Sequence, residues 1–147
     1  MKIAIACDHR GYEMKKKLIP LLKKMGHEVQ DFGCDSTAAV DYPDHAIPAA
    51  KAVADGTHEF GILLDGSGIG MSVAANKVPD IRAGLVHDET TAHRAREHNH
   101  CNVLCMGTDL LSEEQIRRIV EIFLSTACGE GRHTRRVEKL RDFERRR

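Results

Sequence analysis

The chain has 147 residues, and its 22 basic and 22 acidic side chains cancel at pH 7. This length predicts a single domain over residues 1–147, and the balanced charge gives no general attraction to nucleic acid or to a membrane surface. No run approaches the roughly 20 apolar residues of a membrane span, no signal-like segment precedes the first predicted strand, and the five cysteines form no CxxC pair. We therefore expect a cytoplasmic protein.

The predicted elements alternate between strands and helices, beginning with the β-branched run KIAIAC. Five strands are predicted, in chain order, over residues 2–7, 27–32, 60–65, 82–86 and 102–107. The helices predicted between and after them cover residues 12–25, 45–55, 69–77, 89–97, 113–127 and 133–145. This alternation is typical of an α/β fold, here a Rossmann-like three-layer sandwich with a five-stranded parallel sheet, plus a C-terminal helix.

The segment DGSGIG, residues 65–70, joins the third predicted strand to a helix. Its glycines (Gly66, Gly68 and Gly70) let the backbone approach a bound group, and amides at a helix start favour negative charge. The spacing is neither that of a dinucleotide-binding loop nor that of a P-loop. A carboxylate beside such amides would repel an anion, so Asp65 favours proton transfer, with the amides stabilising an oxyanion. A mere tight strand-to-helix connection is the alternative.

Further candidates follow from the rule that ligands gather at the carboxyl ends of parallel strands. Asp8 and His9 directly follow the first strand and should lie near the glycine loop, although such a pair is often only a capping arrangement. His98 and Asn99 lie at a helix end just before the fifth strand. The run HNHC, residues 98–101, is too compact to supply a tetrahedral metal site, so no metal is expected.

Two arginines on the last predicted helix form a candidate anion site. Arg132 and Arg136 stand four residues apart, which places both guanidinium groups on one helical face. This arrangement suits bidentate binding of a phosphate. A solvated basic helix is the alternative.

Together, the segments CDHRGYEMKKKL, DYPDHA, GSGIGMSVAANKVPDIRAGLVHDETTAHRAREHNHCNVLCMG and GEGRHTRRVEKL resemble the type B ribose-5-phosphate isomerase family over about residues 1–140. That family also contains the galactose-6-phosphate isomerase subunits. The resemblance implies an aldose–ketose isomerase of the pentose phosphate pathway that works through an enediolate without metal or cofactor. It also implies a homodimer or homotetramer whose active sites are shared across the dimer interface.

The resemblance implies a role for each candidate residue. Asp8 and His98 would assist opening of the sugar ring, Asp65 would move the proton between C2 and C1, and Ser67 would lie near the oxygens that exchange protons. His9, Arg132 and Arg136 would hold the phosphate, while Tyr42 and Asn99 would line the sugar site. The enediolate would be stabilised by the amides of Gly66, Gly68, Ile69 and Gly70.

The chain departs from the family pattern at the position of the base and at Asp109. Many members have a cysteine base where this chain has Asp65, and others have a glutamate where it has Met71, so Asp65 is the candidate base. An aspartate also stands at this position in the galactose-6-phosphate isomerase A subunit. Asp109 stands where an arginine often helps to hold the phosphate, and an acid there would repel a phosphate dianion unless it points away or pairs with a neighbouring arginine.

These departures leave other functions open. The substrate could be galactose 6-phosphate, allose 6-phosphate or a tetrulose phosphate, or the chain could be a non-catalytic sugar-phosphate-binding subunit. A free-standing dinucleotide-binding domain, with Asp88 as the ribose ligand, is disfavoured by the glycine spacing and by the lack of a substrate domain.

Overall fold

The computed structural model describes residues 1–147, and its central element is a wholly parallel sheet with the strand order β2-β1-β3-β5-β4. The strands are β1 (Lys2–Cys7), β2 (Glu28–Asp31), β3 (Phe60–Asp65), β4 (Ala83–Leu85) and β5 (Val103–Gly107). The three central strands β1, β3 and β5 are covered on both faces, so their sequences are nearly continuous apolar runs.

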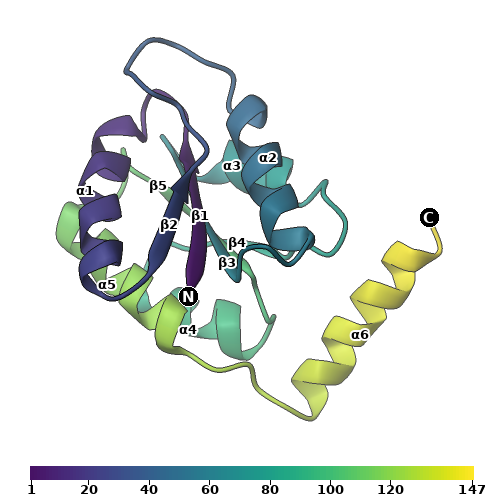
Figure 1. The fold of residues 1–147 in the computed structure, drawn as a ribbon. Helices are drawn as coiled ribbons and strands as arrows, with labels where there is room; N and C mark the ends of the chain where they lie inside the picture. The colour runs from purple at the N-terminus through teal and green to yellow at the C-terminus, as the bar shows by residue number, and fades with distance from the viewer.

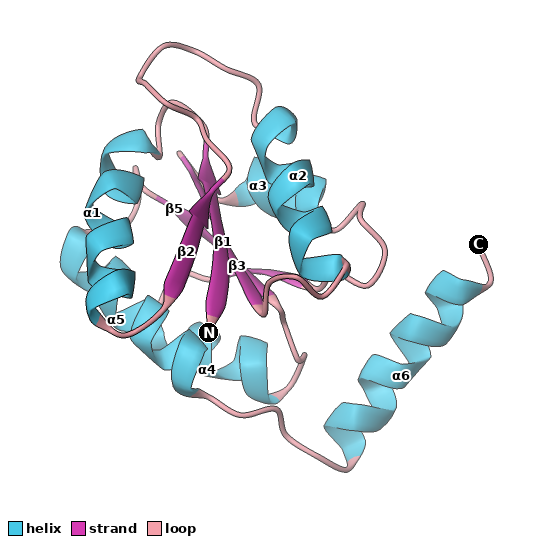
Figure 2. Ribbon diagram, viewed as in Figure 1, coloured by secondary structure: helices cyan, strands magenta, loops and turns pink.

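Helices cover both faces of this sheet (Figures 1 and 2). On one face, the apolar core joins the sheet to α1 (Tyr12–Lys24), α4 (Glu89–Glu97) and α5 (Glu113–Ser125). On the other face, it joins the sheet to α2 (Pro43–Ala54) and α3 (Ile69–Ala75). The predicted three-layer α/β fold is thus confirmed. The last helix, α6 (Arg132–Arg145), lies at the periphery of the molecule (Figure 1), where Val137 is buried and Glu144 accepts a hydrogen bond from the Asp80 amide.

Element ends differ from the prediction by a few residues. Helix α2 begins at Pro43 rather than near His45, because proline fits the first helical turn, where its missing N–H costs no hydrogen bond. The edge strands β2 and β4 are shorter than predicted, since each has a neighbour on one side only. None of the helices combines the length and the apolar composition needed to cross a membrane.

The strand register brings three loops together at one edge of the sheet. Cys7, the last residue of β1, pairs with Leu64 of β3, and Asp65 pairs with Gly107, the last residue of β5. The chain leaves β1 toward β2 on one side, while β3 lies on the other side of β1. Such a reversal opens a crevice above the carboxyl ends of the strands. Asp8, the next residue after β1, lies at this crevice.

A buried lysine fixes the segment that leads from β2 to the crevice. Lys15 of α1 is 2 % exposed, and its Nζ donates hydrogen bonds of 2.6 Å to the Asp31 carboxylate and to the Cys34 carbonyl. Helical spacing alone did not single out this position, because a lysine is normally expected on a solvated face. The contact holds the start of the loop that ends at Tyr42.

Removing the carboxylate partner of this buried ammonium should destabilise the fold. We predict that Asp31→Asn lowers the free energy of unfolding by about 1–3 kcal/mol, since hydrogen bonds to charged groups are worth that much and part of the site is exposed. Glu13→Gln, which removes the exposed partner of Lys16 at 3.9 Å, should cost less than about 0.5 kcal/mol. Equal effects in urea unfolding would show that the buried contact has no special weight.

Candidate active site

The side chain of Asp65 is held by the glycine loop that follows it. Asp65 is 5 % exposed; its Oδ1 accepts a hydrogen bond of 2.5 Å from the Gly68 amide, and its Oδ2 accepts one of 3.3 Å from the Met71 amide. Gly68 has φ +80°, a left-handed conformation, and a Cβ there would lie 2.5 Å from the Leu85 side chain. Glycine is therefore required for the turn that aims this amide at the carboxylate.

The environment of Asp65 raises the pKa of its carboxyl group above the ordinary value of 3.8. The main cause is burial, which disfavours the charged form, and the negative charges of Asp8 and Asp109 add to it. The hydrogen bonds from the Gly68 and Met71 amides act in the opposite direction but do not outweigh burial. Desolvation thus outweighs the amide hydrogen bonds and determines the direction in which the pKa of Asp65 shifts.

The amides of the glycine loop divide into two groups. Those of Gly68 and Met71 are used by Asp65, and the Ile69 amide donates to Ser67 Oγ at 3.2 Å. The amides of Gly66, Ser67 and Gly70 donate no hydrogen bond to the protein. The second group can therefore donate to an oxyanion bound at the loop, whereas the amides of Gly68 and Ile69, also predicted to do so, already donate to Asp65 and Ser67.

The loop after β1 places two further candidates at the crevice. Asp8 is 7 % exposed, and its Oδ1 accepts hydrogen bonds from the Arg10 amide at 2.9 Å and the Gly11 amide at 3.2 Å, while Oδ2 makes none. His9 Nδ1 accepts a hydrogen bond of 3.2 Å from the Val40 amide. An accepting Nδ1 leaves the proton of a neutral imidazole on Nε2, which can donate to a ligand.

Tyr42 joins the crevice from the N-terminal end of α2. A Cβ built on Gly70 would lie 3.1 Å from two ring carbons of Tyr42 and 3.1 Å from Asp65 Oδ2. The tyrosine ring therefore lies against the glycine loop beside the carboxylate, with 38 % of the residue exposed. The structure thus brings together the predicted residues Asp8, His9, Tyr42, Asp65 and the loop 66–70.

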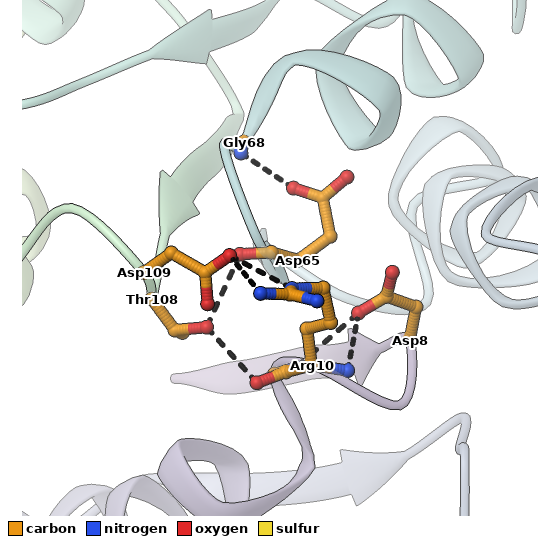
Figure 3. A network of polar contacts seen from close by, with 7 residues as sticks. Asp8, Arg10, Asp65, Gly68, Thr108 and Asp109 are labelled. Atoms are coloured by element: carbon orange, nitrogen blue, oxygen red, sulfur yellow. Dashed lines mark hydrogen bonds and ion pairs between the residues drawn. The ribbon is translucent and has the colours of Figure 1, made fainter. Parts of the chain in front are cut away.

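An ion pair at this crevice joins Asp109 to Arg10, an arginine that the sequence analysis did not identify as its partner. Arg10 Nε donates to Asp109 Oδ2 at 2.7 Å, and Arg10 Nη2 lies 2.7 Å from the same oxygen (Figure 3). Thr108 Oγ1 donates to the carbonyl oxygens of Arg10 and Asp65. The signal in the sequence that could have identified Arg10 is that both charged residues lie just past strand ends, in DHRG and MGTD.

The remaining predicted residues lie at the opposite edge of the sheet. His98 follows α4 and precedes β5, so it lies near the amino end of β5, whereas Asp65 pairs with the carboxyl end of that strand. The His98 ring stacks on His133 of α6 with the centroids 4.4 Å apart, which places the start of α6 at the same edge (Figure 1). His98, Asn99, Arg132 and Arg136 are therefore separated from Asp65 by the length of a strand, roughly 17 Å.

Two alternative sites find no support in the geometry. Asp88 Oδ1 caps α4 by accepting from the amide and the hydroxyl of Thr91, which accounts for an acidic residue at this position. His98 stacks on His133, and His100 Nε2 contacts the Gly129 carbonyl oxygen at 2.7 Å. The structure contains no cluster of three or more His, Cys, Asp or Glu side chains arranged to hold a metal ion.

The chain is similar over nearly its whole length to proteins of one family. Residues 3–140 match the Ribose/Galactose Isomerase family. The ribose-5-phosphate isomerase B of Escherichia coli is 40% identical over 146 residues, which are 99% of this chain and 98% of that protein. Several other relatives carry names that specify a sugar phosphate isomerase without stating the sugar.

Solved structures of such proteins have the same fold. The Clostridium thermocellum ribose-5-phosphate isomerase B superposes with a TM-score of 0.97 at 41% identity, covering 99% of both chains. The Mycoplasma genitalium ribose-5-phosphate isomerase B, solved with bound ribulose 5-phosphate, gives a TM-score of 0.95 at 38% identity, covering 98% of this chain and 96% of that one.

Proposed function

The chain belongs to the ribose/galactose isomerase family, and from this premise we propose that it interconverts ribose 5-phosphate and ribulose 5-phosphate through an enediolate. The observation that carries the proposal is the buried Asp65 carboxylate beside loop amides that have no acceptor in the protein. A base next to oxyanion donors is what removal of a proton beside a carbonyl group requires. The bound ketose phosphate of the M. genitalium relative agrees with this substrate.

The proposed reaction moves one proton between two carbons. After the ring of ribose 5-phosphate opens with the help of Asp8, Asp65 takes the proton from C2, and the electron pair shifts to the carbonyl oxygen at C1. The amides of Ser67 and Gly70 then stabilise the enediolate oxygens. Asp65 returns the proton to C1, while the proton of the C2 hydroxyl passes through Ser67 Oγ to the oxygen at C1, so that a C2 carbonyl and a C1 hydroxyl form and ribulose 5-phosphate results.

The raised pKa of Asp65 supports its role as the base. A carboxylate with an ordinary pKa is a weak base toward a carbon-bound proton, and burial brings its pKa nearer to the working pH. The amide donors at Oδ1 and Oδ2 hold the group in one orientation. Met71, where other family members have a glutamate, is buried and has no titratable group.

We propose that a second copy of the chain completes each active site. His98, Asn99, Arg132 and Arg136 lie at the other edge of the sheet, so they reach Asp65 only from a neighbouring copy. Large apolar side chains are exposed on α3 (Ile69 and Val73) and on α6 (Leu140 and Phe143). Such side chains mark surfaces that associate. The proposal is a homodimer, alone or paired into a tetramer, located in the cytoplasm, where its five free thiols stay reduced.

The role of Asp65 as the base is tested by measuring turnover of ribose 5-phosphate by the purified chain and by the variant Asp65→Asn. The parent should convert ribose 5-phosphate, and the variant should lose about 10²–10⁴-fold in kcat, the usual contribution of a general base, while still binding substrate. Asp44→Asn, an exposed position at the start of α2, should match the parent. Near-parental turnover by Asp65→Asn would refute the assignment. A parent active only on galactose 6-phosphate or allose 6-phosphate would change the sugar but keep the chemistry.

The pH dependence of the same reaction has a defined sign. The base works deprotonated, so kcat/KM should fall as the pH drops through the pKa of Asp65. Because burial raises that pKa, the fall should be centred above 3.8. An acid limb centred at or below 3.8 would contradict the raised pKa.

Sharing of the site between two copies predicts complementation of inactive variants. Asp65→Asn and His98→Asn should each be nearly inactive alone. After mixing in equal amounts with subunit exchange, half of the dimers are mixed and each has one intact site, so about a quarter of the parental activity should return. Mixed dimers verified by mass spectrometry that show no gain over the separate variants would rule out a shared site.

A further inference from the structure

Arg10 is held in a fixed position at the entrance to the glycine loop. Its side chain lies against Gly66, because a Cβ built there would be 2.9 Å from Arg10 Nε and 3.0 Å from Arg10 Cδ. At the backbone, the Arg10 amide donates to Asp8 and the Arg10 carbonyl accepts from Thr108. At the tip, Asp109 binds the guanidinium. The three loops after β1, β3 and β5 thus meet at this one side chain (Figure 3).

The guanidinium retains donors for a ligand. Asp109 Oδ2 engages Nε and Nη2, while Nη1 makes no hydrogen bond in the structure. The side chain of Arg10 is 58 % exposed, so this edge of the guanidinium is accessible from solvent. A guanidinium that is already oriented by a carboxylate loses less conformational freedom when it binds an anion.

The charges at the crevice explain why such a cation is needed. Asp8, Asp65 and Asp109 place three carboxylates at this edge, and their mutual repulsion contributes to the raised pKa of Asp65. A phosphate dianion entering here would be repelled unless cations met it, and Arg10 is a cation on the same edge, whereas Arg132 and Arg136 would come from the second copy. Arg10 is next to His9, whose Nε2 carries the proton that a phosphate oxygen would accept.

We infer that Arg10, positioned by Asp109, is a further residue that binds the phosphate of the substrate, beside His9. Asp109 acts through Arg10 as a positioning residue rather than by touching the substrate. The inference rests on the proposed function for the sugar that carries the phosphate, whereas the phosphate contact itself can be tested without turnover.

The test compares the parent with Arg10→Gln, the double variant Arg10→Gln/Asp109→Asn and the control Arg118→Gln. Arg118 forms only exposed ion pairs with Glu89 and Glu114 on the outer surface. Two quantities are measured: kinetics with ribose 5-phosphate, and calorimetric binding of inorganic phosphate. Loss of a charge-assisted contact should raise KM and the phosphate Kd by about tenfold to hundredfold in both Arg10 variants. The kcat should stay within about threefold, and Arg118→Gln should match the parent.

The double variant separates a phosphate contact from simple charge neutralisation. If Arg10 served only to neutralise Asp109, removal of both charges would return KM and Kd to the parental values, and this result would overturn the inference. Unchanged KM and Kd in Arg10→Gln would also overturn it. In Arg10→Lys, which keeps the positive charge but not the fork of donors, KM and the phosphate Kd should lie between those of the parent and those of Arg10→Gln. If thermal melting shows that Arg10→Gln does not fold, Arg10→Lys is compared with the parent in its place.

The outcomes for the inference and for the proposed function are distinguishable. If the parent turns over ribose 5-phosphate with a KM that is independent of Arg10, the inference fails and the proposed function stands. If the parent does not turn over this sugar but binds phosphate through Arg10, the inference stands and the proposed function fails. A parent that shows neither turnover nor phosphate binding would overturn both.

Discussion

The in-register pairing of β1, β3 and β5 is the constraint on which the rest of the site depends. It ends all three strands at one edge of the sheet, so that Asp8, Asp65 and the loop carrying Asp109 become neighbours. Burial at this edge and the proximity of like charges both raise the pKa of Asp65. The same pairing places the proposed base beside amide donors at the start of α3 and beside an arginine that offsets the negative charge.

The features that could be predicted from the sequence are those that depend on the local pattern of apolar and polar residues. The apolar run before Asp65 identified a buried strand, and the alternation of strands and helices identified the parallel sheet and therefore the edge at which Asp8 and Asp65 meet. The sequence did not predict the contact of Arg10 with Asp109, because these residues lie 99 positions apart and their pairing depends on side-chain direction. The burial of Lys15 was missed for a similar reason, since its partners Asp31 and Cys34 lie on another element.

The resemblance and the structure together divide the predicted site into two halves. Asp8, His9, Tyr42 and the glycine loop belong to one edge of the sheet, while His98 and the arginines of α6 belong to the other. Helix α4 must run back across the sheet before β5 begins, so any residue at its C-terminal end faces away from the glycine loop. This topology is the basis for our proposal that two copies share each site, and the exposed apolar side chains Leu140 and Phe143 of α6 (Figure 1) agree with it.

The central claim is that Asp65 moves a proton between carbon atoms of the substrate. The most direct measurement is proton NMR of ribose 5-phosphate incubated with the enzyme in heavy water, in which a base that exchanges its proton with solvent introduces deuterium at C1 of the ketose and C2 of the aldose. The account predicts deuterium incorporation by the parent and almost none by Asp65→Asn. Incorporation by Asp65→Asn at the parental rate would contradict it, because another group would then be the base.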